Sequence, residues 1–113
     1  MTTTQPEIDN LVERARVAQQ LYEATGTQEW FDKAATAAAW ALMEPARNAE
    51  LAAFAVAETG LGNVADKITK NHRKTLGLLR DIKGQKSFGL VDDNPLTGIS
   101  KFLRPKGVVA AIV

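Results

Sequence analysis

The last seven residues read Gly107-Val-Val-Ala-Ala-Ile-Val113, and none of them has a polar side chain. A strand with one face in water alternates apolar and polar residues, whereas a strand covered on both faces is apolar throughout. We therefore interpret this run as a buried strand, which needs strands beside it and packed layers above and below. Because the sequence ends here, we expect a longer α/β protein or a partner chain to supply the rest of the sheet.

Two other interpretations of the same run stay open. It can be the central strand of a small closed α+β domain, or it can be a segment of buried helix. Periodicity alone does not separate a short apolar strand from a buried helix. If the run is an unpaired strand, its free backbone groups and apolar side chains favour self-association.

Two amphipathic helices are predicted in the first part of the chain. Thr4-Gln-Pro-Glu7 has the spacing of a capping box, and Gly26 is expected to end the helix that follows. Thr27 is expected to cap the second helix, and Pro45 to end it.

A third helix is predicted to begin at Pro45 and to stop at the break Thr59-Gly-Leu-Gly-Asn63. A fourth is predicted from about Asn63 to Ile82, where apolar residues recur at helical spacing. We expect four aromatic residues at helical spacing to lie in the core: Trp30, Phe31, Trp40 and Phe54.

A two-stranded β-ribbon is predicted after Gly84. Ser87-Phe-Gly-Leu-Val91 and Gly98-Ile-Ser-Lys-Phe-Leu-Arg104 alternate apolar with polar or small residues. Asp92-Asp-Asn-Pro95 between them is typical of a turn. The fold class expected from the residues is an α+β fragment of an α/β protein.

The composition limits the kinds of function that the chain can have. Its 113 residues allow one modest domain, and 45% hydrophobic with 24% charged residues is ordinary for a globular protein. A net charge of +1 gives no reason to expect binding to nucleic acid or to a membrane surface. No stretch approaches the ~18 apolar residues that a membrane span needs, and the N-terminus does not have the pattern of a secretory signal. We expect a cytoplasmic protein.

Charge is divided unevenly along the chain. Residues 1–62 carry 4 basic and 9 acidic side chains, and residues 63–113 carry 10 basic and 4 acidic ones. One interpretation is that facing helices neutralise each other. The alternative is an anion-binding helix that uses Lys67, Lys70 and Lys74.

The residues that usually carry catalysis are scarce. There is no cysteine and only one histidine, His72, so we expect neither a metal site nor a cysteine nucleophile in these residues. Asp92 and Asp93 are adjacent in sequence, and adjacent side chains on an extended segment point apart. Gly60 and Gly62 follow no strand, so they do not form a dinucleotide-binding fingerprint. No catalytic residue is predicted.

The order of these elements resembles the N-terminal region of the aldehyde dehydrogenase superfamily. Two motifs carry the resemblance: Ala57-Glu-Thr-Gly-Leu-Gly62, which closes the third helix, and Arg104-Pro-Lys-Gly-Val-Val-Ala-Ala-Ile-Val113. Asn63-Val-Ala-Asp-Lys-Ile-Thr-Lys-Asn71 is similar to the CoA-acylating branch, and within it the type acting on sulfoacetaldehyde is the nearest.

The resemblance implies an N-terminal fragment with three parts. Residues 1–83 would be the helical part of the cofactor domain, residues 84–106 a β-ribbon that forms homo-oligomers, and residues 107–113 the first strand of a Rossmann-like NAD(P)-binding sheet. Ile112 and Val113 match positions in the wall of the cofactor pocket.

The resemblance also implies an activity. The full-length protein would convert an aldehyde, coenzyme A and NAD or NADP into an acyl-CoA and the reduced cofactor. The family uses a cysteine thiolate, which this chain lacks, so the fragment alone is expected to be inactive. The alternative is a non-enzymatic helical interaction or assembly module, whose exposed strand edge recruits a partner.

Overall fold

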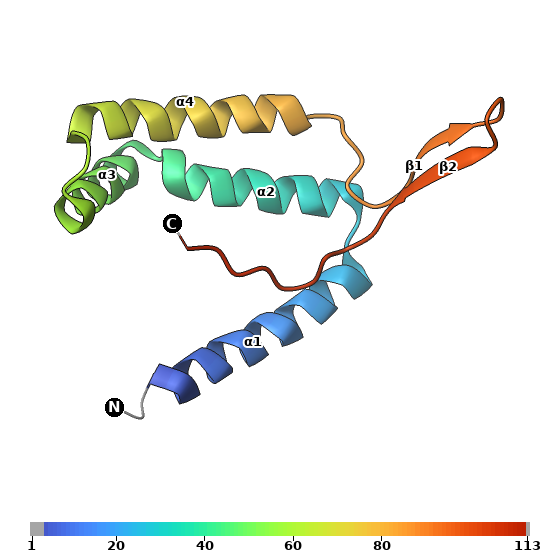
Figure 1. The fold of residues 1–113 in the computed structure, drawn as a ribbon, viewed down its shortest axis with the longest axis horizontal. Helices are drawn as coiled ribbons and strands as arrows, with labels where there is room; N and C mark the ends of the chain where they lie inside the picture. The colour runs from blue at the N-terminus through green and yellow to red at the C-terminus, as the bar shows by residue number, and fades with distance from the viewer. Residues whose placement is uncertain (1–3, 113) are drawn as a thin grey trace. The chain divides into compact units, whose positions relative to one another are not determined.

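The computed structural model describes residues 4–112, in which four helices are followed by a two-stranded antiparallel sheet (Figure 1). The elements are α1 (Thr4–Thr25), α2 (Gln28–Met43), α3 (Pro45–Thr59), α4 (Val64–Ile82), β1 (Gly89–Asn94) and β2 (Ile99–Leu103). The chain divides into two compact units, one of residues 1–30 with residues 86–113 and the other of residues 31–85. The predicted four helices and ribbon are confirmed.

Local chemistry determines where α2 and α4 begin. The Thr27 hydroxyl oxygen accepts a hydrogen bond from the backbone N–H of Trp30 at 3.2 Å, as expected for the cap of α2. The Asn63 side chain accepts from the backbone N–H of Asp66 at 2.9 Å at the start of α4. α1 differs slightly from expectation, because it begins at Thr4 itself rather than after it.

The junction between α3 and α4 depends on a glycine in the left-handed region. Gly60 has φ 66°, and its backbone N–H donates to the carbonyl of Val56 at 2.8 Å. This geometry ends a helix, and a side chain at this position would be strained. The predicted break at residues 59–63 is confirmed.

Glu44 caps α3, which the sequence reasoning did not predict. Its carboxylate accepts from the backbone N–H groups of Ala46 at 3.2 Å and Arg47 at 2.8 Å, and Pro45 follows at the first helical position. These bonds favour the charged form and hold the pKa of Glu44 below its usual value of 4.5. A carboxylate here also interacts favourably with the positive end of the helix.

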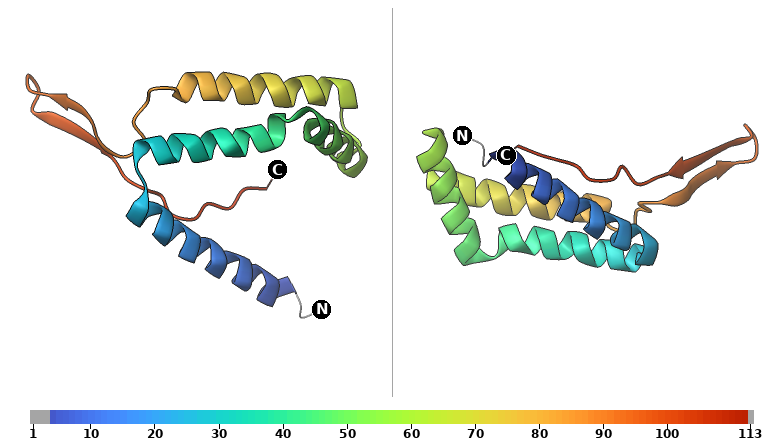
Figure 2. Two further views of the ribbon diagram at one scale, coloured as in Figure 1. Left: turned by 180° about the vertical axis from the view of Figure 1, so that it is seen from behind. Right: turned by 90° about the horizontal axis from the view of Figure 1, so that it is seen from below.

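α3 packs closely against α4 in the unit of residues 31–85 (Figures 1 and 2). Ala52, one helical turn after Asn48 in α3, is 0% exposed. Beside it, Asn48 is 2% exposed and donates through its amide nitrogen to the carbonyl of Ile68 at 3.0 Å. The Asn71 amide donates to the Asn48 oxygen, also at 3.0 Å. The buried polar residue is therefore hydrogen-bonded, as a buried amide needs to be.

The expectation of an aromatic core is wrong for most of its members. Trp30, Trp40 and Phe54 are each more than half exposed, and only Phe31 is intermediate. All four residues lie in helices, as their spacing predicts. No element among residues 4–112 covers the faces on which the three exposed rings lie, so spacing alone did not make them core residues.

The position of the predicted turn in the ribbon needs correction. β1 extends through Asn94, and the turn occupies residues 95–98 rather than 92–95. Asp92 pairs with Lys101 and Asp93 with Ser100 in the antiparallel register. Cross-strand partners for both carboxylates thus outweigh their preference for turns.

The terminal run is not a strand within the described chain. Residues 104–112 have no regular secondary structure, and Val113 lies outside the described residues. Within residues 4–112, β1 and β2 pair only with each other, so no strand lies beside residues 107–112. The predicted first strand of a Rossmann-like sheet is not formed in residues 107–112, because a strand needs a hydrogen-bonded neighbour.

Removal of the Asn48 side chain should destabilise the α3–α4 pair. Asn48→Ala leaves the Asn71 amide without this acceptor and opens a small cavity, so we expect a loss of about 1–3 kcal/mol in unfolding free energy. Urea unfolding followed by circular dichroism measures it. Asn10→Ala, on the exposed surface of α1, is the control, and equal unfolding free energies for the two variants would contradict the role of Asn48.

The Glu44 cap should make helix stability depend on acid. Because the pKa of Glu44 is lower in the folded chain, its contribution is complete above about pH 4.5 and is lost as the pH falls through the folded-state value. Glu44→Gln should therefore melt at a lower temperature than the natural protein at pH 6, and the difference should shrink on acidification. Glu50→Gln, an exposed carboxylate on the same helix, is the control. A difference that does not change with pH would contradict this account.

Candidate functional site

The terminal run, residues 107–112, is the first candidate surface. Val109 is mostly exposed and Ile112 is fully exposed, although both side chains are apolar. Ile112 is one of the two residues predicted to line a cofactor pocket, and the other, Val113, lies outside the described residues. The arrangement offers an apolar strip and no charged group for a phosphate. The role of these two residues at a cofactor stays a prediction.

The β1–β2 ribbon is the second candidate surface (Figure 2). Leu90 lies opposite Phe102 on the neighbouring strand. Both strands expose apolar side chains to solvent, and Phe102 is 60% exposed. β1 and β2 are the two strands of the sheet formed by residues 4–112, so each keeps one unpaired edge. Such edges accept a further strand.

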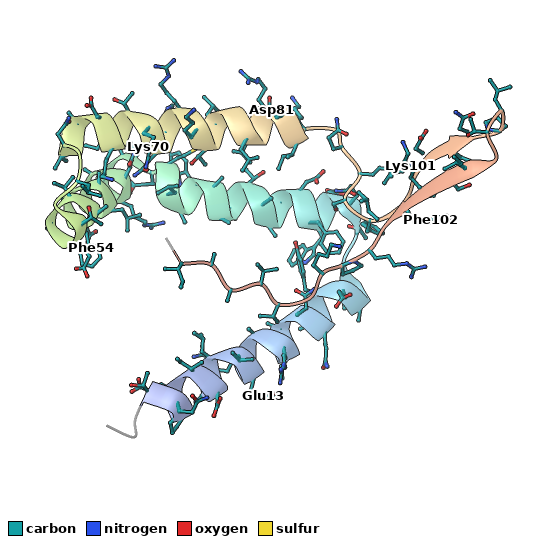
Figure 3. All side chains as sticks on the ribbon, in the orientation of Figure 1. Glu13, Phe54, Lys70, Asp81, Lys101 and Phe102 are labelled. Carbon is teal, nitrogen blue, oxygen red and sulfur yellow. The ribbon has the colours of Figure 1, made fainter. Side chains whose placement is uncertain are left out.

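Polar pairs hold the ribbon in register. The ammonium of Lys101, which is labelled in Figure 3, lies 3.2 Å from a carboxylate oxygen of Asp92. The Ser100 hydroxyl donates to Asp93 at 2.7 Å. The two carboxylates therefore belong to different cross-strand pairs. This arrangement excludes the paired carboxylates that acid–base catalysis would need at this position.

The turn of the ribbon presents a single large apolar residue. The Asn94 side chain accepts from the backbone N–H groups of Leu96 at 3.0 Å and Thr97 at 3.3 Å, and Gly98 donates to the Asn94 carbonyl at 2.9 Å. Leu96 is 95% exposed at this tip. Three hydrogen bonds thus order a turn whose most prominent side chain is apolar.

The basic side of α4 is the third candidate surface. Lys67, Lys70 and Lys74 follow one another at the spacing of a single helix face, and Figure 3 labels Lys70 among them. Among residues 4–112 these three lysines form no ion pair, whereas Arg80 on the same helix lies 3.1 Å from Asp81. Mutual neutralisation by facing helices, the first interpretation of the charge pattern, is therefore not seen for these lysines within the described part of the chain.

The single histidine does not lie in a metal-binding cluster within residues 4–112. His72 lies beside a shallow hollow of about 370 Å³ between α3 and α4, whose wall also contains Asn48, Ile68 and Arg73. Within the described chain no group of three or more His, Cys, Asp or Glu side chains could hold a metal ion. The three surfaces offer apolar contact, strand edges and positive charge.

No helix within residues 4–112 combines the length and the apolar character that crossing a bilayer requires.

Comparison with known proteins identifies relatives of the chain. It is 58% identical over 102 residues to a sulfoacetaldehyde dehydrogenase (acylating) of Cupriavidus necator, which covers 90% of this chain and 20% of the relative. It is 47% identical over 106 residues to a protein of the same name from Bilophila wadsworthia, covering 94% of this chain and 23% of the relative. The bifunctional aldehyde-alcohol dehydrogenase AdhE of Escherichia coli K12 is 37% identical over 111 residues, covering 98% and 12%.

These matches cover nearly all of this chain and a small part of each relative. The chain spans about a fifth of the length of the first two relatives. No protein-family model and no solved structure matches it. The resemblance expected from the motifs at residues 57–62, 63–71 and 104–113 is confirmed: the chain is homologous, over about a fifth of their length, to the acylating aldehyde dehydrogenases.

Proposed function

We propose that these residues belong to a CoA-acylating aldehyde dehydrogenase that depends on NAD or NADP. In the reaction, an aldehyde, coenzyme A and NAD(P)⁺ give an acyl-CoA, NAD(P)H and a proton. The observation that carries the proposal is the 58% identity over 102 residues to a relative named as an acylating dehydrogenase. The same name at 47% identity supports it.

Sulfoacetaldehyde is the proposed substrate. Two relatives carry sulfoacetaldehyde in a name that includes the word acylating, and a third, 40% identical, is named sulfoacetaldehyde dehydrogenase. A relative at 37% identity is named for succinate semialdehyde instead. Both substrates are small aldehydes with an anionic group, so a site for an anionic aldehyde is the coarser form of the proposal.

The described residues would contribute support and contacts rather than the chemical step. They contain no cysteine, and thiolate attack on the aldehyde needs one. The nicotinamide cofactor, when bound, would accept the hydride from the substrate. Ile112 and Val113 would form part of the pocket wall beside the nicotinamide ring. Their apolar side chains can contact the ring but cannot bind the phosphates of the cofactor.

The three predicted parts of the chain fit this proposal. Residues 1–83 would support the cofactor domain, residues 84–106 would form the assembly ribbon, and residues 107–113 would enter a covered sheet. The exposure of Val109 and Ile112 supports the last assignment, because apolar strand residues need cover. A second subunit of the same protein is the proposed partner of the ribbon. The unpaired strand edges of the ribbon and its exposed Phe102 support that assignment.

The activity can be tested directly on the complete product of the reading frame. With sulfoacetaldehyde and coenzyme A, we expect formation of the acyl-CoA together with stoichiometric reduction of NAD or NADP. The 113-residue chain alone is the control and should be inactive, because it has no cysteine to attack the aldehyde. A complete product that binds partners through the ribbon but reduces no cofactor with any small anionic aldehyde would favour an assembly module instead.

A further inference from the structure

One side chain connects two segments that are far apart in the sequence. Gln28, the first residue of α2, contacts Ser87, which lies two residues before β1 and 59 positions further along the chain. The Gln28 oxygen accepts from the Ser87 backbone N–H at 2.8 Å and lies 3.2 Å from the Ser87 hydroxyl. The Gln28 amide nitrogen donates to the same hydroxyl at 3.1 Å. We refer to these contacts as the Gln28–Ser87 clamp.

The chemistry of the clamp suits an amide side chain. The backbone N–H can only donate, so the atom that faces it must be the amide oxygen. The amide nitrogen then faces the hydroxyl, which can accept from it and donate its own proton to the oxygen. A glutamate at position 28 would keep both acceptor contacts and lose the donor, whereas alanine would lose all three.

The clamp joins the residues that follow α1 to the residues that precede β1. Gly26 and Thr27 separate α1 from α2, and the Thr27 hydroxyl caps α2 next to Gln28. On the other side, Gly89 begins β1 with φ 75°, a conformation that favours glycine. Both ends of the clamp belong to the compact unit of residues 1–30 and 86–113. The residues just before the ribbon thus lie between a side-chain contact at Ser87 and a glycine with positive φ at position 89.

We propose that Gln28 is a positioning residue that anchors the start of the β1–β2 ribbon to the joint between α1 and α2. Residues 83–88 connect α4 to β1, and residues 85–87 among them have no regular secondary structure. The clamp fixes the residues from which β1 begins, within the unit of residues 1–30 and 86–113. Its consequence for assembly rests on the proposed function, in which the ribbon contacts a second subunit.

The test measures hydrogen exchange of residues 87–91 by mass spectrometry. Gln28→Ala should raise exchange at these amides about tenfold, because the Ser87 N–H loses its acceptor and the ribbon start is released. Gln28→Glu should stay near the natural protein, because its carboxylate still accepts from the backbone N–H. Ser87→Ala should have a smaller effect, and adding it to Gln28→Ala should give no further increase.

The controls separate a local anchor from general loosening. Gln20→Ala removes an exposed amide from α1 and should leave exchange at residues 87–91 unchanged. Exchange at those residues that is the same in Gln28→Ala and in the natural protein would overturn the proposal, and so would equal effects of Gln28→Ala and Gln20→Ala. Should Gln28→Ala fail to fold, unchanged exchange at residues 87–91 in Ser87→Ala would overturn the proposal instead.

The mass of the complete product in solution separates the anchor from assembly. Faster exchange with fewer assembled subunits supports both the anchor and the ribbon interface. Faster exchange with unchanged assembly supports the anchor and contradicts the ribbon as the surface through which subunits associate.

Discussion

Apolar side chains must be withdrawn from water for helices and strands to be stable, and most of those in this chain are not covered by residues 4–112. Among the described residues, Ala52 is the one hydrophobic residue that is buried. The close contacts between elements are α3 with α4 and β1 with β2. Hydrophobic burial is the main favourable term in folding, so the exposed apolar residues of the helices, the ribbon and the terminal run point to further protein surface that would cover them.

Helix ends were predictable because single residues determine them. Gly60 ends α3 through its positive φ, Asn63 caps α4 with its own side chain, and Thr27 caps α2. The Glu44 cap escaped prediction because Pro45 was the more obvious signal. The pairing of Asp92 with Lys101 escaped it because a turn preference is local, whereas a cross-strand partner is known only once the register is fixed.

The polar contacts of the fold were not predictable from sequence, for the same reason. Two hydrogen-bonded pairs join distant positions: Asn48 with Asn71, 23 residues apart, and Gln28 with Ser87, 59 residues apart. No periodic pattern in the sequence predicts either pair. For the candidate site, the motifs were informative about ancestry, and the relatives confirmed the resemblance. The cofactor role of Ile112 stays a prediction. A pocket wall needs other residues that face it across the pocket, and the described residues place none opposite Ile112.

The central claim is that residues 107–112 become a covered strand in the complete protein. Backbone amides of a central strand exchange slowly because they are hydrogen-bonded to the neighbouring strands and covered by packed layers on both faces. Hydrogen exchange at residues 107–112 should be fast in the 113-residue chain and slower by several orders of magnitude in the complete product of the reading frame. Fast exchange at these residues in a folded, active complete product would contradict the account.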